Sequence, residues 1–418
     1  MAGTLIALLT AGTRGDVAPF VALALGLRRA GYEVRLCVPA SYAPLADEQG
    51  LPHASIDDEL LRLKETPEGR EALSSPSSRL RLIRRVRPMM RRQLDDAWAG
   101  CESASLVIAH PKTLAGPHIA ERLGIECLVA LPLPMLVPTR TFLSPAMPRL
   151  LPGMVGNRLS HALARLAYAP FGGVVNGWRT QVLGLPRRRR PADPTSRPDG
   201  TPHPVLFAFS STLVPRPADW GSHVHVTGDW PLADVGWSPP ADLLSFLSAG
   251  PTPIYVGFGS IPSSDAARTS ALVLEALALA GRRGVLATGG GGLARVDAPG
   301  TVFFLPHVSH RWLFDRVAAV VHHGGAGTTH AGLRAGRPTV VCPIFGDQSF
   351  WASRVAALGA GPGPLPLRGL TPQRLAAAMT LATSEPSLSE QARLVGNDLR
   401  KEDGVARAVS LVTRALGE

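Results

Sequence analysis

The chain has 418 residues, too many for one ordinary hydrophobic core, so two domains are expected. Its composition, 45% apolar and 18% charged, is that of a globular protein and does not indicate disorder. The net charge of +11 suggests an anionic partner, and much of the excess lies in residues 79–92 and 187–190. Nucleic acid is not expected, because the chain has no basic residues interleaved with aromatic ones and no nucleic-acid-binding motif.

No export signal or membrane anchor is expected. Residues 1–9 lack the basic start of a signal peptide and are predicted as a strand. No stretch of about 18 residues is free of charges and helix breakers, so no transmembrane helix is predicted. The cysteines stand far apart in or beside apolar runs, which predicts reduced core residues of a cytoplasmic protein. They are Cys37, Cys101, Cys127 and Cys342.

A strand–helix–strand pattern opens the chain. A buried strand is predicted over residues 4–9, a Gly-containing turn over 10–17 and a helix over 19–30. Residues 131–171 are apolar and broken by prolines, which favours loops beside an apolar ligand but equally fits a core segment with irregular turns. The other elements expected in this half are strands 32–38, 106–109, 126–130 and 205–210, and helix 116–123.

A second alternating pattern begins at residue 224, after a proline-rich boundary. It predicts strands 224–227, 254–258, 284–288, 302–304, 317–321 and 339–342, helices 269–280, 350–358 and 372–382, and a helical tail over 387–416. Two such patterns predict an α/β protein of two Rossmann-like, doubly wound domains that face a cleft. The expected domains are residues 1–220 and 221–398, with a C-terminal helix at 399–418 packing back on the first domain.

The most informative motif follows the apolar run 317–321. His322 and His323 precede a Gly-Gly-Ala-Gly turn and two threonines, Thr328 and Thr329. A glycine-rich turn between a strand and a helix exposes the first N–H groups of the helix, which together with the helix dipole bind phosphate. A plain tight turn is the alternative reading. Zinc is not expected, because adjacent histidines do not match zinc spacings and no cysteine cluster lies nearby.

The motif and its surroundings resemble the nucleotide-sugar signature of GT-B glycosyltransferases, most closely the group of sterol glucosyltransferases and actinobacterial antibiotic glycosyltransferases. The resemblance includes residues 319–336 and 346–351 and extends over both halves of the chain. Its other segments are residues 12–17, 213–220, 256–260 and 310–314. It implies the GT-B fold, with the acceptor bound by the N-terminal domain and the donor by the C-terminal domain.

The resemblance also implies a donor site for a nucleotide sugar, with UDP-glucose expected. The diphosphate would lie at Ser260, His323, Gly325, Gly327 and Thr328, and the nucleoside along Val308 and near Trp312. Asp347 and Gln348 would bind sugar hydroxyls, since carboxylate and amide groups suit neighbouring hydroxyls. No D-x-D metal motif is present, and no metal or other cofactor is expected.

The acceptor hydroxyl needs a general base. Asp16 follows the first strand, at the sheet edge where doubly wound folds place ligands, and the resemblance assigns an acidic base there. Asp16 also suits the role of a helix cap, and its pKa must rise for it to be a strong base. His110 is a second candidate base. The predicted reaction is a direct displacement with inversion, in which His323 and the helix dipole stabilise the leaving phosphate.

Three other functions remain open from the sequence. They are a dTDP-deoxysugar-dependent antibiotic glycosyltransferase, a nucleotide-sugar epimerase of the same fold and a non-catalytic nucleotide-sugar or lipid-binding protein. The acceptor is expected to be a hydrophobic molecule such as a sterol, a macrolide or another polyketide. Ser349, Gly290 and His330 depart from the sterol-group pattern on the donor side.

The basic stretch from Arg79 to Arg92 has two interpretations. It is predicted as an amphipathic helix interrupted at Pro88. Such a helix can lie on an anionic membrane, which would place the protein peripherally at the inner membrane face, or be a solvated helix over the acceptor cleft.

Overall fold

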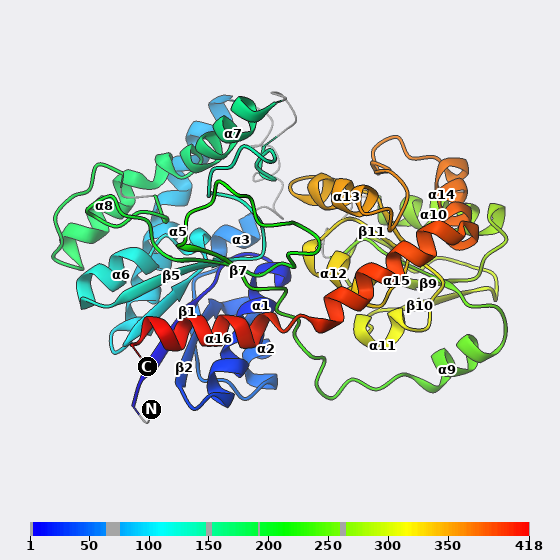
Figure 1. Ribbon diagram of the computed structural model, residues 1–418, viewed down its shortest axis with the longest axis horizontal. Coiled ribbons are helices and arrows are strands. Elements are labelled where there is room, and N and C mark those ends of the chain that lie inside the picture. The colour runs from blue at the N-terminus through cyan, green and yellow to red at the C-terminus, as the bar shows by residue number, and fades with distance from the viewer. Residues whose placement is uncertain (1–2, 64–75, 148–152, 191–192, 260–264, 418) are drawn as a thin grey trace. The chain divides into compact units, whose positions relative to one another are not determined.

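The computed structural model describes residues 3–63, 76–147, 153–190, 193–259 and 265–417. The chain divides into two compact units, each built on one parallel sheet (Figure 1). Unit 1 comprises Met1–Phe209, Arg216–Ala233 and Asp403–Glu418, and unit 2 comprises Ser210–Pro215 and Asp234–Glu402. The predicted α/β class with two doubly wound sheets is confirmed.

Unit 1 contains a seven-stranded sheet in the order β3-β2-β1-β4-β5-β6-β7, parallel throughout. Its central strands are almost entirely apolar because helices cover both faces. The strands are β1 (Leu5–Leu9), β2 (Glu33–Pro39), β3 (His53–Ile56), β4 (Leu106–Ala109), β5 (Glu126–Leu131), β6 (Val205–Phe207) and β7 (Val224–Val226).

Eight α-helices of unit 1 fall within the described residues. They are α1 (Arg14–Arg29), α2 (Ala43–Glu48), α3 (Glu59–Leu63), α5 (Pro76–Cys101), α6 (Gly116–Leu123), α7 (Met154–Leu166), α8 (Gly172–Gln181) and α16 (Gly404–Ala415). Helix α5 runs through Pro88 without a break, so the predicted interruption there is wrong. A proline inside a helix removes one backbone hydrogen bond, and here the packing of Met89, Met90 and Leu94 holds the helix together.

Two predicted boundaries also need correction. The first helix begins at Arg14 rather than at Pro19, because Thr13 and Asp16 form a capping box that starts it earlier. Strand β7 was assigned to the second pattern, but it pairs with β6 and completes the first sheet. The sequence of one short apolar strand does not indicate which sheet it joins, because either sheet could pair with it.

Helix α16 returns to unit 1 and packs on α1 (Figure 1). Ala408 and Val412 are fully buried there, and the Tyr32 hydroxyl donates to Thr413 Oγ1 at 2.9 Å. Gly26 makes the close approach possible, since a Cβ at this position would lie 2.3 Å from Val405 Cγ1.

Unit 2 contains a five-stranded parallel sheet in the order β10-β9-β8-β11-β12. Its strands are β8 (Ile254–Gly257), β9 (Gly284–Ala287), β10 (Val302–Leu305), β11 (Val320–His322) and β12 (Thr339–Val341). Its helices within the described residues are α9 (Ala241–Ser248), α10 (Ala266–Leu279), α11 (His310–Phe314), α12 (Ala326–Arg334), α13 (Gln348–Ala357), α14 (Pro372–Ser384) and α15 (Pro386–Lys401).

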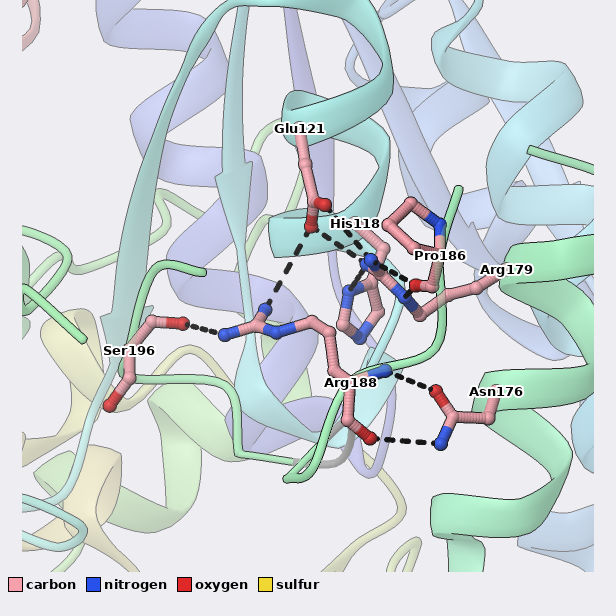
Figure 2. A network of polar contacts seen from close by, with 7 residues as sticks. All are labelled: His118, Glu121, Asn176, Arg179, Pro186, Arg188 and Ser196. Carbon is pink, nitrogen blue, oxygen red and sulfur yellow. Dashed lines mark hydrogen bonds and ion pairs between the residues drawn. The ribbon is translucent and has the colours of Figure 1, made fainter. Parts of the chain in front are cut away.

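A buried polar network joins α6, α8 and the loop after α8 (Figure 2). Arg179 is fully buried, and its five N–H groups all have acceptors. Two of these bonds go to the Glu121 carboxylate at 2.7 and 2.9 Å, one goes to His118 Nδ1 at 2.8 Å, and two go to the Pro186 carbonyl. The network thus joins α8 to α6 and to the loop after α8.

Candidate active site

The parallel sheet of unit 1 brings the two predicted bases together. Strands β1 and β4 are neighbours, with Leu9 opposite Ala109, so the loops after them leave the same edge. Asp16 lies in the first turn of α1 after β1, and His110 directly follows β4. His110 Nε2 lies 3.3 Å from Asp16 Oδ1, and both side chains are over nine-tenths buried.

A third residue completes this cluster. Lys112 Nζ lies 2.7 Å from each Asp16 carboxylate oxygen. The Thr13 N–H donates to Asp16 Oδ2 at 2.9 Å, so Asp16 does cap α1. His110 Nδ1 accepts the Lys112 N–H at 3.2 Å, which leaves the ring proton on Nε2, facing Asp16.

These contacts set the charges. Burial raises the pKa of Asp16, but the Lys112 ammonium and the hydrogen bond from His110 outweigh burial and hold that pKa well below its usual range. Burial lowers the pKa of His110, although Asp16 opposes this. The pair at neutral pH is therefore a carboxylate beside a neutral imidazole. The rise in the pKa of Asp16 that a strong base needs is not present in this state.

An apolar groove lies on α7. Its volume is about 540 Å³, and it is lined by Arg140, Met154, Val155, Arg158, Leu159 and Ala162. The groove belongs to the proline-broken region 131–171, for which the sequence predicts no individual helix, and α7 lies within it. Burial raises the pKa of Tyr168, which follows α7, to about 12, and the negative charge of Asp16 adds to this rise.

In unit 2, the residues predicted to bind the donor follow three different strands. His323, Gly325, Gly327 and Thr328 follow β11, Asp347 and Gln348 follow β12, and Val308 and Trp312 follow β10. All strands are parallel, so these residues share one edge of the sheet. Ser260 lies outside the described residues.

The Gly-rich turn leaves the start of α12 open. Gly325 is the N-cap residue and supplies no side-chain cap to the first N–H groups of α12. Gly324 has a φ of +98°, and its N–H donates to His322 Nδ1 at 3.0 Å, so that amide is not available to a ligand. Gly327 has open space where a Cβ would stand. These features are those of an anion-binding helix start.

His323 packs between glycines. A Cβ at Gly259 would lie 2.4 Å from His323 Cε1, and one at Gly325 would lie 2.7 Å from Nε2. Burial lowers the pKa of His323 to about 4, and its Nδ1 has no hydrogen-bond partner. Burial therefore keeps the ring neutral in the ligand-free state, and a neutral ring can donate a hydrogen bond.

Other side chains of the predicted donor site are engaged within the protein. The Thr329 hydroxyl donates to the Gly325 carbonyl at 2.9 Å. Gln348 Oε1 accepts the N–H groups of Ile344 and Phe345, and Asp347 Oδ2 accepts Trp351 Nε1 at 2.9 Å. These bonds orient the β12–α13 turn.

The two residues predicted to contact the nucleoside lie close together after β10, Val308 just before α11 and Trp312 within it. Val308 is buried in the unit 2 core, whereas Trp312 is half-buried. The Arg316 guanidinium lies 4.2 Å from the Trp312 ring, and Trp237 packs at 5.4 Å.

Two family models match the chain, one in each half. Residues 6–140 match the glycosyltransferase family 28 N-terminal domain. Residues 291–407 match the C-terminal domain of erythromycin biosynthesis protein CIII-like proteins.

Similar proteins include two sterol 3-beta-glucosyltransferases. The one from Cryptococcus neoformans var. neoformans is 33% identical, over 98% of this chain and 27% of that protein. UGT80A2 of Arabidopsis thaliana is 35% identical, over 97% of this chain and 64% of that protein. The chain thus spans about a quarter of the length of the fungal relative.

A solved structure shares the fold of both units. The glycotransferase of kitacinnamycin has a TM-score of 0.72 at 20% identity and covers 99% of this chain and 100% of its own. The chain belongs to the GT-B glycosyltransferases.

One departure of this glycosyltransferase from the sterol-group pattern has a clear structural role. His330 is buried in α12, where Nδ1 donates to the Ala326 carbonyl and Nε2 accepts the Ser210 N–H at 3.2 Å. This bond holds residues 210–215, a separate segment of unit 2, against α12. Ser349 is exposed, and Gly290 is half-buried in the loop after β9.

Sequence reasoning missed Lys112. A single lysine has no motif, but its position offers a signal: it stands three residues after the carboxyl end of β4, the strand beside the one that leads to Asp16. Among the described residues, no three His, Cys, Asp or Glu side chains are grouped to hold a metal ion. No described helix is long and apolar enough to cross a bilayer.

Proposed function

We propose that this glycosyltransferase moves a hexose, glucose from UDP-glucose, to a hydroxyl of a hydrophobic acceptor such as a sterol, a macrolide or another polyketide. The observation that carries the proposal is the buried pair of Asp16 and His110, 3.3 Å apart at the carboxyl edge of the unit 1 sheet. The open start of α12 supports the donor half, and the apolar groove on α7 supports a hydrophobic acceptor.

In the proposed reaction, the acceptor oxygen attacks the anomeric carbon while the bond from that carbon to the diphosphate oxygen breaks. Asp16 takes the hydroxyl proton, and His110 orients the carboxylate through its Nε2–H. The leaving diphosphate keeps the electron pair of the broken bond. The first N–H groups of α12 and the His323 ring stabilise its charge, with Asp347 and Gln348 on the sugar hydroxyls. Attack from the opposite face inverts the anomeric centre.

A UDP-release assay with UDP-glucose, EDTA and a panel of sterols and macrolides tests the proposal. We expect acceptor-dependent release that falls about 10²- to 10⁴-fold in Asp16→Asn, because loss of a general base has effects of that size. Asp58→Asn is the matched control, a second buried carboxylate of unit 1 outside the cluster. Release unaffected by Asp16→Asn would move the role of base to His110.

The same assay separates the other functions. Release from dTDP-deoxysugars but not from UDP-glucose would identify a deoxysugar transferase. Conversion of the sugar without an acceptor would identify an epimerase. Nucleotide-sugar binding without turnover would leave a binding protein.

We also propose contact with an anionic membrane, at its inner face, through the basic stretch from Arg79 to Arg92. Arg87 is exposed, whereas Arg92 pairs with Asp57 and Glu59. The side chains of residues 79–85 lie outside the described part of the chain. Vesicle sedimentation with and without phosphatidylglycerol tests the contact, comparing Arg87→Glu with Arg374→Glu, an equal charge change on exposed α14. Equal sedimentation of both variants and the wild type would reject it.

A further inference from the structure

The Asp16 carboxylate has no acceptor capacity left for a substrate. Its two oxygens receive Lys112 Nζ at 2.7 Å each, the Thr13 N–H at 2.9 Å, the Thr13 hydroxyl at 3.3 Å and His110 Nε2 at 3.3 Å. A carboxylate offers about four lone-pair sites. An acceptor hydroxyl that approaches Asp16 must therefore displace one of these groups.

Of the groups bound to Asp16, Lys112 is the one that can move away most easily. The Thr13 N–H belongs to the capping box of α1, and His110 is buried with an exposure of 5%, so both are fixed. The Lys112 side chain is 44% exposed and ends a flexible four-carbon chain, so its ammonium can turn into solvent.

The backbone beneath Lys112 is fixed by contrast. The Lys112 N–H donates to His110 Nδ1, and the Thr113 hydroxyl donates to the His110 carbonyl at 2.8 Å. Leu114 closes the turn with a φ of +56°, a left-handed conformation that costs a non-glycine residue free energy. Leu114 is 3% exposed, and its packing in the unit 1 core compensates for this strain. The backbone of this turn is therefore rigid, whereas the Lys112 ammonium that it carries can move.

We propose that Lys112 is a displaceable lock on Asp16: its ammonium occupies the place of the acceptor hydroxyl, and acceptor binding moves it away. Lys112 is a positioning residue that acts through Asp16. This inference rests on the proposed role of Asp16 as the base. The titratable groups in contact with the carboxylate are Lys112 from the turn after β4 and His110 at the end of β4. Tyr168, after α7, interacts with its charge electrostatically.

Kinetics of Lys112→Met test the lock, with Lys112→Arg as the charge-retaining control. In the methionine variant, burial of Asp16 is no longer opposed by the ammonium, so the acid limb of kcat/KM should move to higher pH by about one unit or more. Above that limb, the acceptor KM should fall several-fold, because nothing must be displaced. The arginine variant should keep the wild-type acid limb. An unmoved limb, or a KM that stays constant or rises, would overturn the lock.

A second readout does not need activity. A carboxylate whose folded pKa is depressed stabilises the protein above its unfolded pKa, and this stability is lost as pH falls through the folded pKa. The melting-temperature difference between wild type and Lys112→Met should therefore be largest near neutral pH and shrink as pH falls below about 4. Lys401→Met, which removes the exposed pair with Asp398, should show a small difference at every pH.

The kinetics and the melting curves distinguish failure of the proposed function from failure of the Lys112 lock. A wild type that releases no UDP with any acceptor would reject the proposed function, while the melting curves would still test the contact of Lys112 with Asp16. A melting difference that does not change with pH would reject that contact as the source of the Asp16 charge.

Discussion

His323 lies in the Gly-rich turn before α12 as a neutral, buried ring with an unpartnered nitrogen. A ring in this state gains most from an anion, because a nearby negative charge favours the imidazolium that burial disfavours. In the proposed donor site, nucleotide binding would therefore be coupled to proton uptake.

We predict that a nucleoside diphosphate binds more tightly as the pH falls from 8 toward 5. The pKa of His323 is about 4 without ligand, and the diphosphate raises it, so affinity rises as pH falls through the pKa of the complex. Calorimetry in two buffers of different ionisation enthalpy would measure the proton taken up. His323→Gln keeps a neutral donor and should lose the proton uptake. Equal uptake in that variant would assign the proton to another group.

Gly259 supports His323 from the neighbouring loop. We predict that Gly259→Ala weakens nucleotide affinity about tenfold or more, because a Cβ would push the ring aside. The matched control is Gly281→Ala, with a similar φ of +61° against +68° but open space around the Cβ. Both variants should lose about 1–2 kcal/mol of stability from the left-handed backbone. Calorimetric titration with UDP compares them, and equal affinities would exclude the clash.

At the scale of elements, the sequence predicts strands better than it predicts the helices between them. The apolar runs that became β1, β4 and β8 are recognisable because both faces of a parallel sheet are buried. The same sequence could not predict that α5 continues through Pro88, since tertiary packing decides this. Asp16 and His110 were predictable from strand ends, whereas their shared contact with Lys112 required the sheet order.

The buried network of Arg179 gives a prediction at this scale (Figure 2). Arg179→Lys should lower the free energy of unfolding by about 3–5 kcal/mol, because lysine has three donors for five acceptor contacts and leaves Glu121 poorly paired. Arg188→Lys is the control in the same network, as its guanidinium lies 4.0 Å from Glu121. Denaturant unfolding measures both, and similar losses would mean that general packing, not the bidentate pair, carries the effect.

At the scale of the whole molecule, unit 1 is assembled from chain segments far apart in sequence. Helix α16 packs on α1, where Gly26 sets how closely the helices approach, and its Thr413 accepts a hydrogen bond from Tyr32, just after α1.

We predict that Gly26→Ala destabilises unit 1 by about 1–3 kcal/mol, because the new methyl group overlaps Val405. Gly177→Ala in α8 is the control; its Cβ meets nothing within 4 Å, and alanine favours a helix by about 0.5–1 kcal/mol. Calorimetry of thermal unfolding measures both variants. An equal loss of stability in both would show that the overlap with Val405 is not its cause.

The contact of α16 with α1 also has a consequence for biosynthesis. A ribosome makes the first strand and helix long before it makes residues 404–415, and unit 2 is synthesised in between. Until translation reaches α16, the side of α1 around Leu27 that α16 later covers has no partner from that helix. The nascent protein can therefore complete unit 2 before unit 1, because α16 is made after unit 2 but belongs to unit 1.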